Sequence, residues 1–123
     1  FSNRDTVAIT EVAGLADEDF QVITAVASQF YACLCMGSKA HTSSLSSCLP
    51  EPMIEIYELF IQGKYEDSFA AQRRINAFLV EFLKNTKKDN FIQAGDEKYI
   101  LKLRIMFNEY VTSYYRQVDE GEK

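Results

Sequence analysis

The chain has 123 residues, of which 47% are hydrophobic and 25% are charged, a balance typical of a soluble globular domain. Its net charge of −5 argues against nucleic acid as the main partner, because binding to phosphates requires a clustered basic surface. The longest uncharged stretch, residues 20–38, contains serine, threonine and glutamine, so it predicts a strand and a helix and no membrane span. We also find no pattern of a secretory signal peptide.

The cysteines and the single histidine do not form a metal-binding pattern. Cys33 and Cys35 are two residues apart in an apolar helical segment, which directs them to different sides, and Cys48 lies in another segment. With His41 as the only histidine, the spacing of a zinc site is missing. We therefore expect buried or semi-buried reduced thiols in a cytoplasmic protein and no metal, with a reactive cysteine as the alternative.

The N-terminal segment predicts a short helix followed by a turn. Asp5 is a suitable N-cap for a helix over residues 6–13, and Gly14 is expected to end that helix. The segment "ADED" (16–19) then predicts a turn.

The next segment predicts a strand, a helix and a second strand. Residues 20–26 are rich in β-branched side chains and mostly apolar, as in a strand buried on both faces. Ser28 is expected to cap the helix that follows, and Gly37 to end it in a left-handed conformation. Residues 40–45 are the second strand candidate. So short a crossover through a helix implies that the two strands are parallel.

From Pro52 onward the spacing of apolar residues predicts three helices. Gly63 closes the first, the second runs from Tyr65 to about Lys84, and the third starts at Asp96. The expected apolar stripes are Met53, Ile56, Tyr57 and Phe60 in the first, Phe69, Ile75, Phe78, Leu79 and Phe82 in the second, and Tyr99, Ile100, Leu103, Met106, Phe107, Tyr110 and Tyr114 in the third. Two buried parallel strands need further neighbours, so the chain is interpreted as the end of a larger α/β domain.

Four segments, taken in order, carry a resemblance to a known family. They are "FSNRD" (1–5), "FQVITAV" (20–26), "GSKAHTSSLSSCLPE" (37–51) and "MIEIYELFIQGKYEDSFAAQRRINAFLVEFL" (53–83). Together they resemble the C-terminal portion of the dihydrodipicolinate synthase and N-acetylneuraminate lyase family, which are Schiff-base (class I) pyruvate aldolases. The most specific part of the match runs through Gly63, Lys64, Tyr65, Ala70 and Gln72.

The resemblance implies a fold and a division of the chain. The fold is an α/β (β/α)8 TIM barrel, of which this chain would supply the end of strand six, strands seven and eight, and helices six to eight, so that the segment alone is mostly helical. Residues 1–62 would be the last βα units, residues 63–118 a C-terminal helical extension, and residues 119–123 a frayed tail.

The resemblance also implies the chemistry. A lysine is expected immediately before Phe1, and its amine condenses with the ketone of pyruvate or another 2-oxo acid to form an iminium, which lets a neighbouring C–C bond break or form. The family's proton-shuttling tyrosine and threonine also lie outside this chain. We expect that the chain is a piece of a longer polypeptide, cut at or just after that lysine.

Substrate-binding residues are expected where barrel strands end. Thr42, Ser43 and Ser44 are small enough to leave space there and carry hydroxyl groups for substrate oxygens, and the resemblance adds Ser2 and Ala25. The alternative is that the serines only fill a tight gap between strand and helix.

The chain also departs from the family pattern. Ala25, Ala27 and Ser28 stand where sialic acid lyases have a glycine, an aspartate and a glutamate, which disfavours sialic acid, and Ser47 replaces an asparagine. Lys39 and His41 are expected at the entrance of the second strand, away from the chemistry, in structural or solvent-exposed roles.

The resulting interpretation is a pyruvate-dependent aldolase or lyase acting on a 2-oxo sugar acid or a similar small molecule. A dehydratase or a pyruvate-condensing synthase of the same family is an alternative, and a non-catalytic helical interaction module over residues 52–118 is an alternative of another class. For the enzyme we expect no cofactor, no nucleic acid or membrane partner, and a homo-oligomer, a tetramer by the family's habit.

Overall fold

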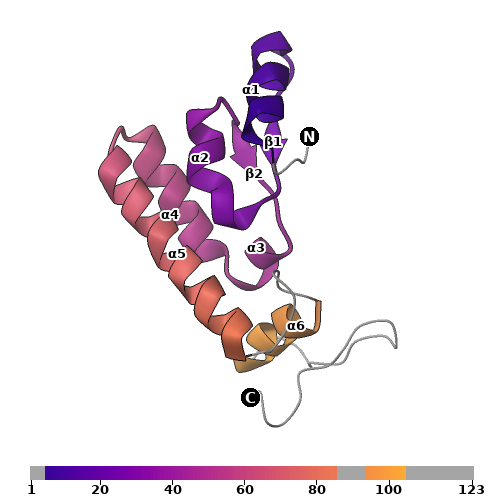
Figure 1. Ribbon diagram of the computed structural model, residues 1–123, viewed down its shortest axis with the longest axis vertical. Coiled ribbons are helices and arrows are strands. Elements are labelled where there is room, and N and C mark those ends of the chain that lie inside the picture. Colours follow the sequence, from indigo (N-terminus) through magenta and orange to yellow (C-terminus); the bar gives the residue numbers. More distant parts are fainter. Residues whose placement is uncertain (1–4, 86–93, 105–123) are drawn as a thin grey trace. The chain divides into compact units, whose positions relative to one another are not determined.

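The computed structural model describes residues 5–85 and 94–104 (Figure 1). They belong to two compact units, Phe1–Asn76 and Ala77–Lys123, whose boundary falls inside one long helix. The described residues are mostly helical, with one two-stranded sheet, so the prediction of a mostly helical segment is confirmed. None of the described helices is both long and apolar enough to cross a membrane.

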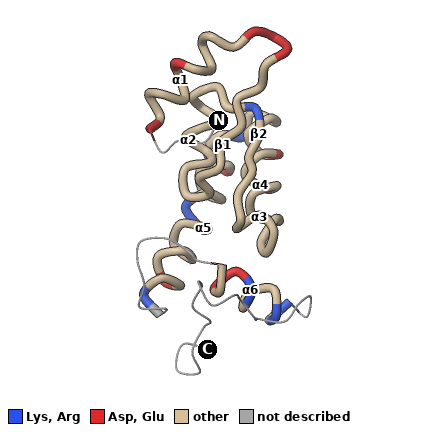
Figure 2. Tube along the Cα trace, turned by 90° about the vertical axis from the view of Figure 1, so that its right-hand side faces the viewer, with Lys and Arg blue, Asp and Glu red and all other residues tan. Residues whose placement is uncertain are grey.

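Helix α1, Thr6–Leu15, begins where the sequence predicted. The side chain of Asp5 accepts a hydrogen bond of 2.9 Å from the backbone N–H of Val7, which satisfies one of the donors left open at the helix start. The expected end at Gly14 is wrong, because helical hydrogen bonding continues to Ala16, whose N–H donates to Val12 O. Beyond it, the acidic turn at residues 17–19 gathers negative charge at one end of the first unit (Figure 2).

Two very short parallel strands form the sheet. Strand β1, Ile23–Thr24, pairs with strand β2, Ala40–His41, in the register Ile23 with Ala40 and Thr24 with His41, so the predicted parallel pairing is confirmed. The strands are shorter than the predicted 20–26 and 40–45. After His41 the backbone turns into the short helix α3, Leu45–Cys48, so the prediction of Leu45 as a strand residue is wrong.

Strand β1 is buried on one face only, which corrects the expectation that both faces are covered. Val22 and Thr24 are 2% and 0% exposed, whereas Ile23 between them is 36% exposed. Val22 belongs to a core cluster with Ile9 of α1 and Cys33 of α2, so the helices of this unit cover the Val22 face. The alternation follows from the period of two in an extended chain.

The crossover between the strands is a single 3₁₀ turn, η1, Ala27–Gln29, followed by helix α2, Phe30–Cys35. The expected cap at Ser28 is wrong, since Ser28 lies inside the 3₁₀ turn and the residues at the two N-cap positions, Val26 and Gln29, form no side-chain cap bond. The predicted end is confirmed, because Gly37 has a φ of +96° and Ser38 N–H closes the helix on Cys33 O at 2.9 Å.

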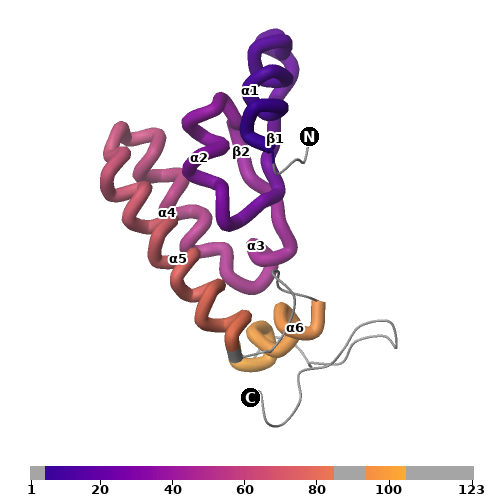
Figure 3. The backbone as a smooth tube through the Cα atoms, in the orientation of Figure 1, coloured from indigo at the N-terminus to yellow at the C-terminus, as the bar shows by residue number. Residues whose placement is uncertain are grey.

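Helix α4, Pro50–Ile61, starts two residues before the predicted Pro52 and packs against α2 and α3. The trace in Figure 3 runs from α1 through β1 into α2, returns through β2, and then enters α4. Met53 and Ile56 are buried as predicted, whereas Tyr57 is 37% exposed. The predicted stop at Gly63 is confirmed by its φ of +75°.

Helix α5, Tyr65–Asn85, matches the predicted span, but the prediction of its inner face is partly wrong. Phe69 and Phe78 of the expected apolar stripe are 49% and 39% exposed. The buried residues of this helix are instead mostly small or polar: Ser68, Ala71, Gln72 and Ile75. Helices α4 and α5 approach each other closely here, which favours small buried side chains on α5. Ser68 Oγ donates to Ile56 O of α4 at 2.8 Å.

Helix α6, Ala94–Leu103, belongs to the second unit and begins two residues before the predicted Asp96. Tyr99 and Ile100 are buried as predicted, whereas Leu103 is 64% exposed. The remaining residues of the predicted stripe lie outside the described residues: Met106, Phe107, Tyr110 and Tyr114. The tail 119–123 lies outside them as well. The predicted division of the chain at residues 62 and 63 stays a prediction.

Candidate functional site

The parallel pairing brings the carboxyl ends of β1 and β2 to the same edge of the sheet. Thr24 and His41 are the last residues of the two strands and lie opposite each other. The ladder extends one step further, because Thr42 N–H donates to Thr24 O at 2.8 Å. Ala25 and Thr42 are therefore the first residues beyond this edge, where the sequence predicted a binding site.

The structure places four of the five predicted substrate-binding residues at this edge. Ala25 and Ser43 are partly buried, and Thr42 and Ser44 are exposed. Ser44 contributes its backbone carbonyl, which accepts from Ser47 Oγ at 2.6 Å as the short helix α3 begins. Ser2, the fifth, lies outside the described residues.

His41 lies at this edge as well, which corrects the expectation that it sits at the entrance of the second strand. Because β2 ends at His41 and not at residue 45, the histidine is next to the predicted site. Its Nε2 is 2.9 Å from Ser43 Oγ. Lys39 fits its expected solvent-exposed position before the strand, where its backbone N–H donates to Val22 O.

The imidazole of His41 is packed against an aromatic ring. Its centroid is 4.5 Å from that of Phe30, which in turn is stacked parallel to Tyr57 of α4 at 6.5 Å. Burial lowers the pKa of His41 from 6.5 to about 4, since a positive charge loses hydration there. The ring is consequently neutral at pH 7, with one nitrogen able to donate and the other to accept.

Ser46 is a site residue that the sequence reasoning missed. Its Oγ is 3.0 Å from Ser43 Oγ, and its backbone N–H donates to Ser43 Oγ at 3.3 Å. The available signal was the spacing of three between a serine just ahead of a helix and a serine in its first turn, where a side chain commonly accepts from the backbone N–H three residues on. His41, Ser43 and Ser46 therefore form a continuous hydrogen-bonded row, which we call the His–Ser–Ser row.

Two buried polar side-chain atoms lack a hydrogen-bond partner among the described residues. They are Nδ1 of His41 and Oε1 of Gln29. Gln29 ends the 3₁₀ turn that leads from β1 into α2, so both residues belong to the segments that follow or end the strands at this edge. Buried polar atoms are nearly always paired with protein or water, so these two atoms mark the unsatisfied polar positions among the described buried side chains.

The three cysteines lie on two helices, Cys33 and Cys35 on α2 and Cys48 on α3. Cys33 and Cys48 are buried, as expected, but Cys35 is exposed, so the prediction of buried or semi-buried thiols is wrong for Cys35. No disulfide joins the three cysteines, all of which are among the described residues. Burial, together with a hydrogen bond to Cys35, raises the pKa of Tyr31 above its usual value.

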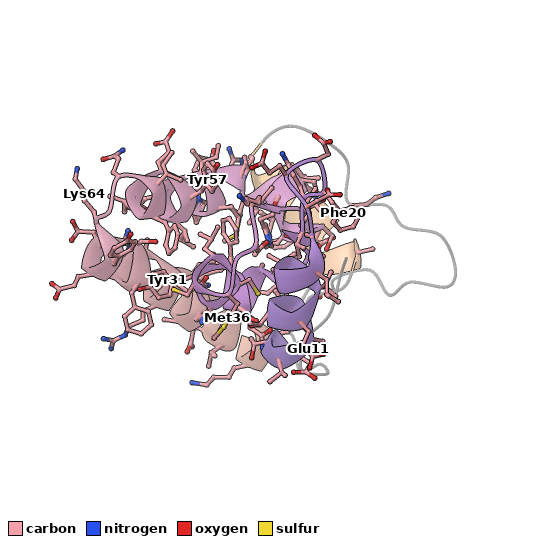
Figure 4. All side chains as sticks on the ribbon, turned by 90° about the horizontal axis from the view of Figure 1, so that it is seen from above. Glu11, Phe20, Tyr31, Met36, Tyr57 and Lys64 are labelled. Atoms are coloured by element: carbon pink, nitrogen blue, oxygen red, sulfur yellow. The ribbon has the colours of Figure 1, made fainter. Side chains whose placement is uncertain are left out.

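Tyr31 also contacts aromatic residues of two other helices. Figure 4 shows it within the helical part of the first unit, and its ring lies 5.9 Å from that of Phe60 and 5.3 Å from that of Phe69. Phe60 in turn meets Tyr65 at 5.2 Å. Tyr65 and Phe69 are about half exposed, at 54% and 49%, so this aromatic group is open to solvent on one side.

The comparisons with known proteins add no family. No family model matches the chain, and no curated protein matches it. Within the described residues, no three His, Cys, Asp or Glu side chains are grouped closely enough to hold a metal ion. The His–Ser–Ser row thus offers neutral donors and acceptors of hydrogen bonds, which suit the oxygen atoms of a small organic ligand.

Proposed function

We propose that the chain supplies the last two strands of a (β/α)8 barrel in a Schiff-base-forming, pyruvate-dependent aldolase or lyase. The observation that carries the proposal is the parallel pairing of β1 with β2, with the hydroxyl side chains of Thr42 and Ser43 directly beyond the carboxyl end of β2 and the small Ala25 beyond that of β1. In barrels of this type the ligand binds at the carboxyl ends of the strands, so Thr42 and Ser43 are placed to meet it.

The open edges of the sheet support the barrel. Within the described residues each strand has one partner only, and the exposed Ile23 and Phe20 are apolar, at 36% and 55% exposure. Strands that lack neighbours present unpaired backbone groups, and closure into a barrel removes such edges. On this proposal further strands pair with β1 and β2 and cover the Ile23 face.

The chemistry follows from an amine placed beside this edge. A lysine immediately before Phe1 attacks the ketone carbon of a 2-oxo acid, and loss of water leaves an iminium. In the cleavage direction the 4-hydroxyl group of the substrate loses its proton, the C3–C4 bond breaks and the distal fragment leaves as an aldehyde, while the electron pair of that bond forms the enamine. Protonation of the enamine at C3 and hydrolysis of the imine by water then release pyruvate and the free lysine. The hydroxyl groups of Thr42 and Ser43 hold substrate oxygens during these steps.

The substrate in this proposal is a 2-oxo acid without the polyhydroxy tail of sialic acid. Ala25 and Ala27 are partly buried and Ser28 is exposed, and none of them offers a carboxylate to bind such a tail. The proposal also includes a cytoplasmic homo-oligomer, because the family that the sequence resembles assembles as tetramers. The imine that a lysine forms with a 2-oxo acid needs no metal or organic cofactor.

The test is borohydride trapping of the full-length polypeptide in the presence of pyruvate. Reduction of the iminium should add the mass of the reduced pyruvate adduct to one lysine, and peptide mapping should locate it next to Phe1. Replacing that lysine with arginine is the matched control, because it keeps the charge and removes the nucleophile. Absence of an adduct with pyruvate and with longer 2-oxo acids would overturn the proposal.

A helical interaction module is the second candidate, and one observation favours it. The aromatic group around Tyr31 leaves Tyr65 and Phe69 about half exposed, and Ile61 nearby in sequence is 62% exposed. Such residues are enriched where proteins bind one another. Replacement of Phe69 by Ser should leave imine trapping unchanged if the enzyme proposal is correct, because Phe69 lies on α5 and not at the edge of the sheet.

A further inference from the structure

Ser43 Oγ has three hydrogen-bonding neighbours in the His–Ser–Ser row. They are Nε2 of His41 at 2.9 Å, Oγ of Ser46 at 3.0 Å, and the backbone N–H of Ser46 at 3.3 Å. A serine hydroxyl has one proton to donate and two lone pairs to accept. The backbone N–H can only donate; it is shared between Ser43 O at 3.1 Å and Ser43 Oγ at 3.3 Å, and its contact with Oγ takes up one lone pair. One proton and one lone pair remain for His41 and Ser46.

Two arrangements of protons satisfy this count. In the first, Nε2–H of His41 donates to Ser43, and Ser43 donates to Ser46. In the second, Ser46 donates to Ser43, and Ser43 donates to an unprotonated Nε2 of His41. The neutral imidazole carries its single proton on Nε2 in the first arrangement and on Nδ1 in the second.

Burial of Nδ1 decides between them. This atom has no hydrogen-bond partner among the described residues, and it is shielded from solvent. A buried N–H without a partner is rare and costly, because it loses its hydrogen bond to water and no protein group replaces that bond. An unprotonated ring nitrogen at the same place has only a lone pair to satisfy. The ring of Phe30, 4.5 Å away, offers no strong hydrogen-bonding group to either form.

We propose that the His–Ser–Ser row is a directed relay, in which His41 donates to Ser43 and Ser43 donates to Ser46, so that the hydroxyl proton of Ser46 is presented to an oxygen atom of the ligand. Among the described residues, Ser46 Oγ has no hydrogen-bond partner other than Ser43, and Ser46 is only partly buried. His41 is thus a positioning residue, and Ser46 is a donor for a carboxylate or carbonyl oxygen.

The ligand part of this inference rests on the proposed function, since a 2-oxo acid supplies such oxygens at the carboxyl ends of the strands. The relay itself does not rest on it. The relay also predicts different roles for Ser46 and Ser47, its neighbour on the same short helix, because only Ser46 has a hydroxyl proton left to donate. Ser47 is exposed, and its hydroxyl donates at 2.6 Å to Ser44 O, so its proton is already used.

The first experiment reads the tautomer of His41 in the full-length polypeptide by ¹⁵N NMR at pH 7, with the His41→Gln variant to assign the ring signals. We expect a protonated Nε2 and an unprotonated Nδ1. The Ser43→Ala variant should shift the Nε2 signal, because it removes the acceptor. A ring protonated on Nδ1 would overturn the direction of the relay.

The second experiment compares Ser46→Ala with Ser47→Ala in the condensation direction, with pyruvate as the varied substrate and a small aldehyde as the acceptor at a fixed saturating concentration. Loss of one hydrogen bond predicts that Ser46→Ala raises KM about fivefold to tenfold with kcat nearly unchanged, whereas Ser47→Ala leaves both unchanged. His41→Leu should raise KM to a similar extent, and His41→Gln should restore it, because the Gln amide also carries an N–H that can donate to Ser43. Equal effects of Ser46→Ala and Ser47→Ala would overturn the role of Ser46.

The two proposals fail in different ways. If pyruvate and longer 2-oxo acids give no borohydride adduct with the wild-type polypeptide, the proposed function and the ligand assigned to Ser46 are both wrong, and the tautomer still decides the relay. If the adduct forms but KM does not respond to Ser46→Ala, the proposed function stands and the role of Ser46 is wrong.

Discussion

The backbone groups at the starts of α1 and α2 find their side-chain hydrogen-bond partners in different parts of the chain, one nearby and one distant in sequence. At α1 the residue next to the helix, Asp5, accepts from the N–H of Val7. At α2 the partners come from α5, more than forty residues later: Gln72 Oε1 accepts from Tyr31 N–H at 2.8 Å, and Asn76 Nδ2 donates to Ser28 O at 3.0 Å. One helix start is therefore fixed by its own sequence, and the other only once the chain has folded.

Gln72 is the centre of the second arrangement. Besides accepting from Tyr31, its Nε2 donates to Ala27 O at 3.0 Å and to Asn76 Oδ1 at 2.9 Å. Gln72 itself is 4% exposed, so these bonds are shielded from water. The crossover that places the carboxyl edge of the sheet is thus held by an amide on α5, which makes α5 a support for the candidate site.

The largest expected effect is that of Gln72→Leu, which removes the distant partner and keeps the volume. Tyr31 N–H and Ala27 O would lose their bonds in a buried place, and we expect a loss of about 3 kcal/mol in the free energy of unfolding. Urea denaturation measures it, with Arg73→Ala as the control on the exposed neighbouring position. A cost below that of Asp5→Ala would show that the distant partner is dispensable.

Acid should destabilise the protein through His41. Its pKa is about 4 in the folded chain and near 6.5 when unfolded, so between these values the unfolded chain binds more protons. Stability is therefore full above pH 6.5 and falls as the pH drops toward 4, by about 2 kcal/mol once the partial exposure of the ring is allowed for. Urea midpoints at pH 7 and pH 4.5 measure the fall. The His41→Gln variant should show a smaller one, and an equal fall in the variant would refute the assignment to His41.

Gly37 and Gly63 both end helices, and comparing them measures how much a tertiary contact adds to the free-energy cost of replacing such a glycine. Both have positive φ, but a Cβ at Gly37 would lie 3.1 Å from Ala13 Cβ of α1, whereas at Gly63 no described atom lies within 4 Å. We expect Gly37→Ala to cost about 1.5 kcal/mol and Gly63→Ala about 1 kcal/mol, from thermal unfolding. Equal costs would mean that Ala13 moves aside freely.

The smallest effect is expected at the local cap. Asp5→Ala removes the bond to Val7 and should cost about 1 kcal/mol, whereas Asp5→Asn should cost less because asparagine is also a good N-cap. Circular dichroism during thermal unfolding measures both. If Asp5→Ala costs more than Gln72→Leu, the contrast between a local and a distant helix start is wrong.

The sequence predicted the features that depend on neighbours in the chain. Asp5 as a cap, Gly37 and Gly63 as helix stops, the span of α5 and the parallel pairing of the two strands all follow from residue type and spacing, and the structure confirms them. Thr42 and Ser43 were predicted inside the second strand, 40–45, and lie directly beyond the carboxyl end of the shorter strand β2; their role in binding stays a prediction.

The errors concern features that depend on packing. Ser28 has the chemistry of a cap, yet the chain forms a 3₁₀ turn there and Asn76 binds its carbonyl instead. Phe69 has the spacing of a core residue, yet Ser68 and Ala71 are buried in its place because α5 approaches its neighbour closely. His41 was predicted to lie away from the site because the type of residues 40–45 did not indicate that β2 ends at residue 41.

By itself, the sequence determined the start of α1, the helix stops at Gly37 and Gly63, the span of α5 and the parallel direction of the two strands, because those choices depend on residue type and spacing within short segments. Only the tertiary structure decided which side chains are buried, how α2 begins, and that His41, Ser43 and Ser46 form one row. Each of these depends on atoms brought together by the fold, such as Phe30 against His41 and Gln72 against Tyr31, and burial and hydrogen bonding act between such atoms whatever their separation along the chain.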